Sequence, residues 1–314
     1  MPSMKAVHIH NYGAADQLIL EDAPRPTPAE GEVLIRVHAT AANPFDCAAR
    51  AGYMSGWYPY SFPLTLGLDI SGVVEEIGDG VEGLAAGEEV WARANPAING
   101  AYAEYVAVAA SEVAAKPPSL DHLQAAAIPH AGLTAWRMLI DAANVGEGHT
   151  VLIHAAAGGV GSLAVQLAKW RGARVIGTAS AHNLEFVREL GADEVVDYNL
   201  TPFEEVVQGV DIVLDTVGGQ TQERSWRVLK PGGILLSIVQ APSQETADAH
   251  GVRQQFVGAF PPAGGVLREL AALVASGHLR PVVSTVLGLH ETPKAHQMLE
   301  GRHVRGKLVL RVAD

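Results

Sequence analysis

The sequence of 314 residues contains a single cysteine, Cys47. One cysteine excludes an intramolecular disulfide and any metal site built from several cysteines. Basic residues are also scarce, with 22 Lys and Arg against 34 Asp and Glu and a net charge of −12. This balance disfavours nucleic acid as the main partner, because phosphate binding needs clustered Lys and Arg.

No uninterrupted apolar run is long enough to span a bilayer, so we expect no membrane partner. The first residues, from Met1 to His8, show neither the apolar core nor the cleavage signature of a secretory signal, which favours a cytoplasmic location. The composition, 48% hydrophobic and 18% charged, is that of an ordinary globular chain. The length predicts roughly two domains.

The first third of the chain is rich in short β-branched runs separated by glycine turns. We predict strands at residues 5–10, 33–39, 70–77, 89–92 and 101–108. Pro24, Pro26 and Pro28 predict an extended loop between the first two strands. Many short strands of this kind indicate a small, barrel-like β domain.

The pattern changes near Pro117 and Pro118, after which strands and helices alternate. Helices are predicted at residues 120–127, 133–142, 159–171, 183–190, 204–208 and 222–229. The intervening strands fall at residues 151–154, 173–178, 194–197, 211–215 and 233–238. This alternation is typical of an α/β fold, with a doubly wound parallel sheet covered by helices on both faces.

The end of the chain returns to shorter segments, at residues 266–276, 282–286 and 293–299, and then to a strand at 307–312. If that strand rejoins the first domain, the α/β domain is an insertion. We therefore divide the chain into a β-rich domain of residues 1–118 and 287–314 and a nucleotide-binding domain of residues 119–286.

A glycine turn connects the strand at 151–154 with the helix that follows it. Such a turn and the helix N-terminus point free backbone N–H groups at one spot, which suits a diphosphate. The alternative is a helix start that merely needs small residues, and the further β/α units behind the turn disfavour it. The predicted cofactor contacts are Ala156, Gly158, Gly159, Val160 and Gly161.

The end of the next strand lacks the acid that usually binds the ribose 2′-hydroxyl of NAD. Ser180, His182 and Asn183 stand there instead, and their side chains are able to hydrogen-bond a 2′-phosphate. No Arg or Lys lies in this turn, so the preference for NADP rests on a missing repulsion. These residues are also suited to cap the following helix, and both roles are compatible.

Further motifs run along nearly the whole chain. They are Asn43-Pro-Phe-Asp46 with Arg50-Ala-Gly52, Gly67-Leu-Asp69, Ala131-Gly-Leu-Thr-Ala-Trp136, Asp215-Thr-Val-Gly-Gly219, Leu229-Lys-Pro-Gly-Gly233 and His303-Val-Arg-Gly-Lys307. Together with the glycine turn, they resemble the zinc-independent, zeta-crystallin-like quinone oxidoreductase branch of the medium-chain dehydrogenase/reductase superfamily. The resemblance implies a GroES-like catalytic domain split around a Rossmann domain, NADPH as cofactor, and reduction of quinones or α,β-unsaturated carbonyls.

The resemblance also locates the three positions that bind zinc in other members of the superfamily. They fall on Asn43, on Leu68 and near Ala131, none of which is a zinc ligand. The 13 histidines form no Cys/His pair and no His-Glu-x-x-His helix, so we predict no metal site. Without a Lewis acid, a conjugated acceptor is easier to reduce than a simple ketone, because its charge is delocalised onto an oxygen that hydrogen-bond donors stabilise.

Three residues are candidates for the catalytic site. Asn43 is placed near the nicotinamide by its position in the motif, although it also suits a loop before Pro44. Tyr53 is a neutral donor suited to a substrate oxygen, in competition with Tyr58 and Tyr60. Thr134 is placed under the nicotinamide by its motif, and its alternative is a helix N-cap.

Other predicted cofactor contacts follow later strands or come from the returning C-terminal segment: Val217, Gly218, Val239 and Lys307. Asp69 either orders Asn43 or makes a purely structural hydrogen bond. Two alternative functions stay open, an enoyl reductase acting on acyl thioesters and a low-turnover NADPH-binding protein with a structural or redox-sensing role. The resemblance further implies a homodimer, for which residues 233–238 and 253–258 are the candidate contact.

Overall fold

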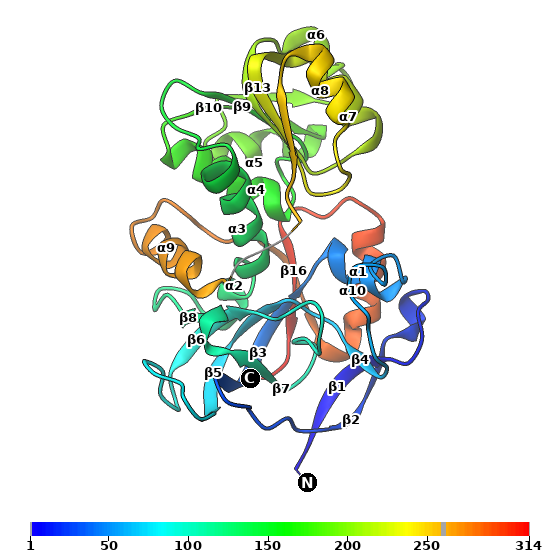
Figure 1. The fold of residues 1–314 in the computed structure, drawn as a ribbon, viewed down its shortest axis with the longest axis vertical. Coiled ribbons are helices and arrows are strands. Elements are labelled where there is room, and N and C mark those ends of the chain that lie inside the picture. The colour runs from blue at the N-terminus through cyan, green and yellow to red at the C-terminus, as the bar shows by residue number, and fades with distance from the viewer. Residues whose placement is uncertain (1, 259–261, 314) are drawn as a thin grey trace. The chain divides into compact units, whose positions relative to one another are not determined.

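The computed structural model describes residues 2–258 and 262–313. The chain forms two compact units, which are described separately (Figure 1). Unit 1 comprises Met1–His130, Pro262–Gly277 and Pro281–Asp314, and unit 2 comprises Ala131–Pro261 and His278–Arg280. Among the described residues, no helix has both the length and the apolar character needed to cross a membrane.

Unit 1 is built on two mainly antiparallel sheets. The smaller has the strand order β2-β1-β4, with β1 (Ser3–Ile9), β2 (Ile19–Pro24) and β4 (Leu64–Thr65). The larger has the order β15-β16-β3-β5-β6-β8, and β7 also pairs with β3. Its strands are β3 (Glu32–Ala42), β5 (Asp69–Ile77), β6 (Glu89–Arg93), β7 (Tyr105–Ala109), β8 (Val113–Ala115), β15 (Val283–Gly288) and β16 (Lys307–Arg311).

Strand β3 organises the larger sheet, because β5, β7 and β16 all pair with it. Leu308 of β16 lies opposite Ala42 of β3, so the end of the chain lies directly beside the start of α1 (Pro44–Arg50). The other helical segments of this unit are η1 (Ala15–Gln17), η2 (Ala110–Glu112), α2 (His122–Ala125), α9 (Gly264–Ala275), η6 (Leu289–Glu291) and α10 (Thr292–Glu300).

Unit 2 contains a six-stranded parallel sheet of order β11-β10-β9-β12-β13-β14. Its strands are β9 (Thr150–Ile153), β10 (Arg174–Ala179), β11 (Glu194–Asp197), β12 (Val210–Asp215), β13 (Leu229–Ser237) and β14 (Arg253–Phe256). This is the strand order of the Rossmann fold, and it reverses between β9 and β12. The central strands are apolar because helices cover both of their faces.

The helices of unit 2 follow its strands in alternation. They are η3 (Arg137–Ala142), α4 (Gly159–Trp170), η4 (Ala181–Asn183), α5 (Leu184–Glu189), α6 (Phe203–Val206), α7 (Gly219–Ser225), η5 (Trp226–Val228) and α8 (Gln244–His250). Helix α3 (Pro129–Trp136) begins with the last residues of unit 1 and continues into unit 2.

The predicted fold class, a β-rich GroES-like domain with a Rossmann domain, is confirmed. The expected return of the last strand to the first domain is confirmed by its pairing with β3. The two units do not meet at the predicted boundaries, 118/119 and 286/287. Strand β15 pairs with β16 and so belongs to unit 1, and α9 does as well.

Some predicted elements were wrong in detail. The segment that ends at Pro24 is a strand, because β2 lies at a sheet edge where proline need not donate a hydrogen bond. Residues 101–104 precede β7 and are not part of it. Thr134 lies inside α3, which begins five residues earlier at Pro129, so the N-cap interpretation of Thr134 was wrong.

Candidate active site

The glycine turn lies at the carboxyl end of β9, beside the point where the strand order reverses. Helix α4 begins at Gly159 with Gly158 as its N-cap, and Val160 and Gly161 complete its first turn. A Cβ on Gly161 would lie 2.3 Å from the Ala155 oxygen, so only glycine lets the helix pack this closely against the turn. A helix N-terminus of this kind presents free N–H groups that suit an anion, and binding of a diphosphate here stays a prediction.

The turn is held by hydrogen bonds to the neighbouring strand β10 and within the turn itself. The Ala156 N–H donates to the Thr178 carbonyl at 3.0 Å, and the Gly158 N–H donates to the Ala155 carbonyl at 2.9 Å. Ala155 has a φ of +47°, in the left-handed region that glycine adopts more readily than alanine. The backbone at this point is therefore strained, and the fixed strand and helix on either side maintain it.

The residues that we assigned to the 2′-phosphate follow β10 and lie together. The Asn183 amide donates to the Ser180 hydroxyl at 3.2 Å, and the His182 ring lies 3.4 Å from the same hydroxyl. His182 is exposed, whereas Asn183 is buried. Asp197 lies opposite Ala179 at the end of β11, and its carboxylate accepts the Asn199 N–H at 3.0 Å. It thus caps its own turn.

Val217, Gly218 and Val239 lie in loops held by one buried carboxylate, that of Asp215. Its Oδ1 accepts the N–H groups of Val217 and Gly218, at 3.0 and 2.7 Å. Its Oδ2 accepts from the Ser237 hydroxyl and the Gln222 amide, both at 2.9 Å. Asp215 therefore ties the ends of β12 and β13 together.

Asn43 in unit 1 is the N-cap of α1 and is only 3% exposed. The sequence favours this helix start, because Pro44 occupies its first turn and Asp46 completes a capping box by accepting the Asn43 N–H at 2.8 Å. The Asn43 side-chain amide donates to the Ala41 carbonyl at 3.1 Å and to Asp69 at 2.9 Å. Both hydrogens of this amide are thus engaged.

The side chain of Lys307, the first residue of β16, hydrogen-bonds to Asn43. Its buried ammonium donates to Asn43 Oδ1, to Asp69 Oδ2 at 3.1 Å and to the Ala42 carbonyl at 3.3 Å. Asp69 is fully buried, and its other oxygen accepts the His130 N–H at 2.7 Å. Three acceptors match the three hydrogens of an ammonium group. Asp69 does therefore contact Asn43, while the cofactor contact of Lys307 stays a prediction.

A chain of contacts through Tyr102, His296 and Arg50 extends this arrangement from Asp46. The Tyr102 hydroxyl donates to Asp46 at 2.9 Å and lies 3.2 Å from His296 Nε2. Arg50 lies 3.2 Å from His296 Nδ1, and because guanidinium only donates, Nδ1 accepts and Nε2 carries the hydrogen. We call Asn43, Asp46, Asp69, Tyr102 and Lys307 the Asn43 cluster.

Burial dominates the protonation of these groups. It raises the pKa of Asp46 to about 6, although hydrogen bonds from Tyr102 and Asn43 act in the opposite direction. It lowers the pKa of His296 to about 3, with a further contribution from the Arg50 charge. His296 is therefore neutral near pH 7.

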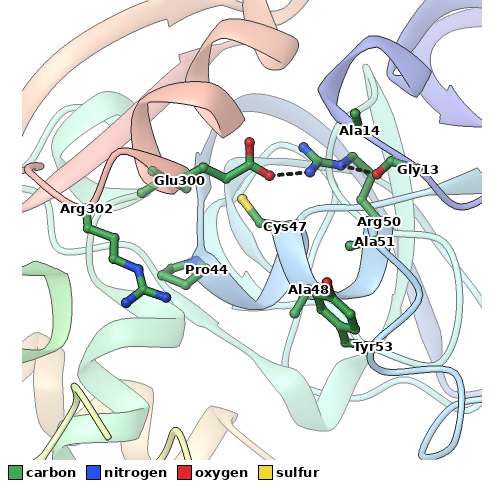
Figure 2. A pocket seen from close by; sticks show the side chains of 11 residues that line it. Gly13, Ala14, Pro44, Cys47, Ala48, Arg50, Ala51, Tyr53, Glu300 and Arg302 are labelled. Atoms are coloured by element: carbon green, nitrogen blue, oxygen red, sulfur yellow. Dashed lines mark hydrogen bonds and ion pairs between the residues drawn. The ribbon is translucent and has the colours of Figure 1, made fainter. Parts of the chain in front are cut away.

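A pocket of about 540 Å³ opens beside α1 and the end of α10 (Figure 2). Arg50 lies at its wall, where it pairs with Glu300 and donates to the Gly13 carbonyl at 3.0 Å. Tyr53 lines the pocket and is 81% exposed, which leaves its hydroxyl accessible to a ligand. Burial raises the pKa of the half-buried Cys47 thiol to about 12, so it is not a nucleophile near pH 7.

Tyr58 and Tyr60, the competitors of Tyr53, pack into an aromatic group with Phe45. The rings of Phe45 and Tyr58 are 5.9 Å apart, as are those of Tyr58 and Tyr60. Burial raises the pKa of the Tyr60 hydroxyl. Thr134 is 3% exposed. Tyr53 is therefore more accessible to a ligand than Tyr58 and Tyr60, which are partly buried.

The sequence did not predict the roles of Asp46, Tyr102 and His296. Asp46 stands in the quoted Asn-Pro-x-Asp motif, and this was the one available signal. Tyr102 contacts Asp46 from 56 residues away in sequence, and His296 contacts Tyr102 from 194 residues away. No local pattern marks such partners.

Two family models match the chain. Residues 29–118 match the alcohol dehydrogenase GroES-like domain, and residues 190–310 match a zinc-binding dehydrogenase model. The mitochondrial NAD(P)H oxidoreductase RTN4IP1 of Danio rerio is 34% identical, over 99% of this chain and 92% of its own. The chloroplastic NADPH-dependent alkenal/one oxidoreductase of Arabidopsis thaliana is 35% identical, over 98% of this chain and 79% of its own.

Among solved structures, the quinone oxidoreductase from Coxiella burnetii superimposes with a TM-score of 0.93. It is 36% identical to this chain, and the match covers 99% of this chain and 100% of that one. Both units therefore have counterparts in one related structure.

Proposed function

Because the chain belongs to the quinone oxidoreductase branch of the medium-chain dehydrogenase/reductase superfamily, we propose that it is an NADPH-dependent reductase of quinones or α,β-unsaturated carbonyls that works without a catalytic metal. That the chain is an NAD(P)H-dependent oxidoreductase follows from its relatives. The observation that carries the finer proposal is the Lys307 ammonium, buried against Asn43 and Asp69.

The proposal that the reaction needs no catalytic metal is supported by the side chains at the zinc-ligand positions. In zinc-holding members, the ligand positions correspond to Asn43, Leu68 and Ala131, which here offer one amide and two hydrocarbon side chains. The Asn43 oxygen already accepts from Lys307, whose nitrogen is 3.1 Å from Asp69. A positive charge in this place repels a second cation and neutralises the buried carboxylate.

The cofactor part rests on the turn after β9 and on the ends of three other strands. Ala156, Gly158, Gly159, Val160 and Gly161 would hold the diphosphate, and the crowding at Gly161 fits a cradle that a Cβ would fill. Ser180, His182 and Asn183 would hold the 2′-phosphate, and Val217, Gly218 and Val239 the rest of the dinucleotide. When bound, NADPH supplies the hydride.

The remaining task of the protein is to orient the acceptor and to stabilise its developing oxyanion. Asn43 has no free amide hydrogen, so we assign it a positioning role, fixed by Lys307 and Asp69. Tyr53 is the accessible hydroxyl donor beside the pocket. Thr134, buried in α3, is proposed to support the nicotinamide. The proton that completes the reduction then comes from solvent or from Tyr53.

The test is the oxidation of NADPH and NADH with a naphthoquinone, an alkenone and a crotonyl thioester. We expect turnover with the first two acceptors, a preference for NADPH and no loss on adding a chelator. Turnover of the thioester alone would indicate an enoyl reductase, and tight NADPH binding without turnover would indicate a binding protein. A strong preference for NADH would contradict our assignment of Ser180, His182 and Asn183.

We further propose that the chain forms a homodimer and acts in the cytoplasm. In the described part of unit 2, β14 (Arg253–Phe256) ends the parallel sheet and has a partner on one side, β13. An edge of this kind is able to continue the sheet into a second copy. Light scattering should give twice the chain mass, and a monomer would contradict the proposal.

A further inference from the structure

Two histidines and a glutamate meet on the hairpin formed by β1 and β2, apart from the Asn43 cluster. His8 lies in β1 and His10 follows two positions later, so their side chains lie on the same face of the strand. Glu21 of β2 lies opposite Ala6, on that face as well. The sequence showed the His-x-His spacing, but only the pairing of the strands brings the carboxylate to it.

The three side chains converge on one oxygen. His8 Nδ1 lies 2.7 Å from Glu21 Oε1, and His10 Nε2 lies 2.9 Å from the same atom. The ligand atoms of all three residues lie within 4.8 Å of one another, and within the described residues no other His, Cys, Asp and Glu side chains form such a group. The two imidazole rings are nearly perpendicular, with an interplanar angle of 84°.

This spacing is close to that of a metal coordination sphere. Tetrahedral zinc with bonds of about 2.0–2.1 Å holds its ligand atoms roughly 3.4 Å apart. Glu21 Oε1, at 2.7 and 2.9 Å from the two nitrogens, therefore needs to move away from them by roughly half an ångström or more to reach this separation. Each neutral imidazole then keeps its hydrogen on the nitrogen that faces away from Glu21.

The exposure of the group favours an exchangeable ion. The His8 side chain is 9% exposed, whereas those of His10 and Glu21 are 47% and 33% exposed. One ligand is thus anchored in the sheet and two face solvent, which leaves room for water at a fourth position. Two imidazoles and a carboxylate suit zinc, copper or nickel and not calcium or magnesium, which prefer oxygen ligands.

We propose that His8, His10 and Glu21 bind one divalent transition-metal ion, with Zn²⁺ as the reference case, at the β1–β2 hairpin. The site uses none of the residues that we assign to the cofactor or the acceptor. Its role is structural, since the ion links the two strands of the hairpin.

The test is a titration of the full-length, untagged chain with Zn²⁺ by calorimetry. We expect one ion per chain. His10→Ala and Glu21→Gln should each weaken binding by at least about tenfold, because even a change in the surroundings of a metal ligand commonly has an effect of this size. His290→Ala, which removes another exposed histidine, should bind Zn²⁺ as the unchanged chain does.

Co²⁺ supplies a second measurement that does not depend on stability. The unchanged chain should give the visible absorption of a low-coordinate Co²⁺ site, and His10→Ala should lose it while keeping its far-ultraviolet circular dichroism. Absence of binding to the unchanged chain, or equal binding by His10→Ala, would overturn the proposal. NADPH oxidation should be equal in the unchanged chain and in His10→Ala. A loss of metal binding is thereby distinguished from a failure of the proposed function.

Discussion

In unit 2 the predicted cofactor residues lie at the carboxyl ends of β9, β10, β12 and β13, and most of the contacts they offer are backbone N–H groups. In unit 1 the residues around Asn43 offer side chains instead, and they come from segments as far apart as Asn43 and Lys307. The backbone cradle follows from one contiguous strand, turn and helix. The side-chain cluster exists only after β3, β5 and β16 have paired.

The two units also differ in the charge that they bury. In unit 1 the charged side chains of Asp46, Asp69, Arg50 and Lys307 are at most 5% exposed. Among the described residues of unit 2, Asp215 is the carboxylate that is buried to the same degree. Buried charges are costly to desolvate and stable only when they are paired. Losing one member of the Asn43 cluster should therefore cost more than losing an equivalent surface pair in unit 2.

Replacing the buried ammonium should produce the largest effect. Lys307→Met leaves the Asp69 carboxylate without its cation, and the loss of one partner of a buried pair costs about 3–5 kcal/mol of stability. The matched change in unit 2 is Lys230→Met, which removes an ion pair with Asp211 from a lysine side chain that is 48% exposed. That loss should stay below about 1 kcal/mol. Urea unfolding measures both, and equal losses would contradict the comparison.

A pH titration of stability tests the buried histidine of unit 2. Burial lowers the pKa of His154 from 6.5 to about 4, and it lies 2.9 Å from the Ser225 hydroxyl. The unfolded chain takes up a proton below pH 6.5 and the folded chain does not, so stability should fall as the pH drops from 6.5 to about 4. The contribution of His154 is roughly 3 kcal/mol over this range.

The control is His154→Gln, whose stability should depend less on pH over the same range. In unit 1 burial lowers the pKa of His122 and of His130 to about 4 as well, and one buried acid opposes these histidines in part. The lowered pKa of His296 makes folding less favourable in acid, while the raised pKa of Asp46 makes it more favourable below about pH 6. Parallel urea-midpoint curves for His154→Gln and the unchanged chain would contradict the assignment.

The difference between the units also explains what the sequence could predict. Helix α4 was predicted at 159–171 and lies at Gly159–Trp170, because the apolar periodicity and the glycines are local signals. Asn43, Asp69 and Lys307 were each singled out by motif, and a contact of Asp69 with Asn43 was one of two alternatives, but the contacts of Lys307 with both were not predicted. Tyr102 and His296 were not predicted at all, since their role depends on which strands and helices become neighbours.

Crowding at the glycine turn should give an intermediate effect. In Gly161→Ala the new Cβ would lie 2.3 Å from the Ala155 oxygen and 2.8 Å from the Ala156 Cα, and both are backbone atoms. Helix α4 then has to move, which costs about 1–3 kcal/mol and should weaken NADPH binding. Gly146→Ala, with no atom within 4 Å of its new Cβ, should be neutral or slightly stabilising. NADPH titration and urea unfolding distinguish the two, and normal NADPH affinity in Gly161→Ala would contradict a cradle at this turn.

The smallest effect should come from relieving the strain at Ala155. Its φ of +47° is a conformation that costs a non-glycine residue about 1–2 kcal/mol. Ala155→Gly removes that cost but gives the unfolded chain more freedom, worth about 0.4–1 kcal/mol, so we expect a net gain of up to about 1 kcal/mol. Asn144 shares the φ of +47° and is a residue type that tolerates it, so Asn144→Gly should gain nothing. Equal shifts of the urea midpoint would show that the strain is not specific to the turn, and a large loss in Ala155→Gly would show that the methyl group, and not the backbone, shapes the cradle.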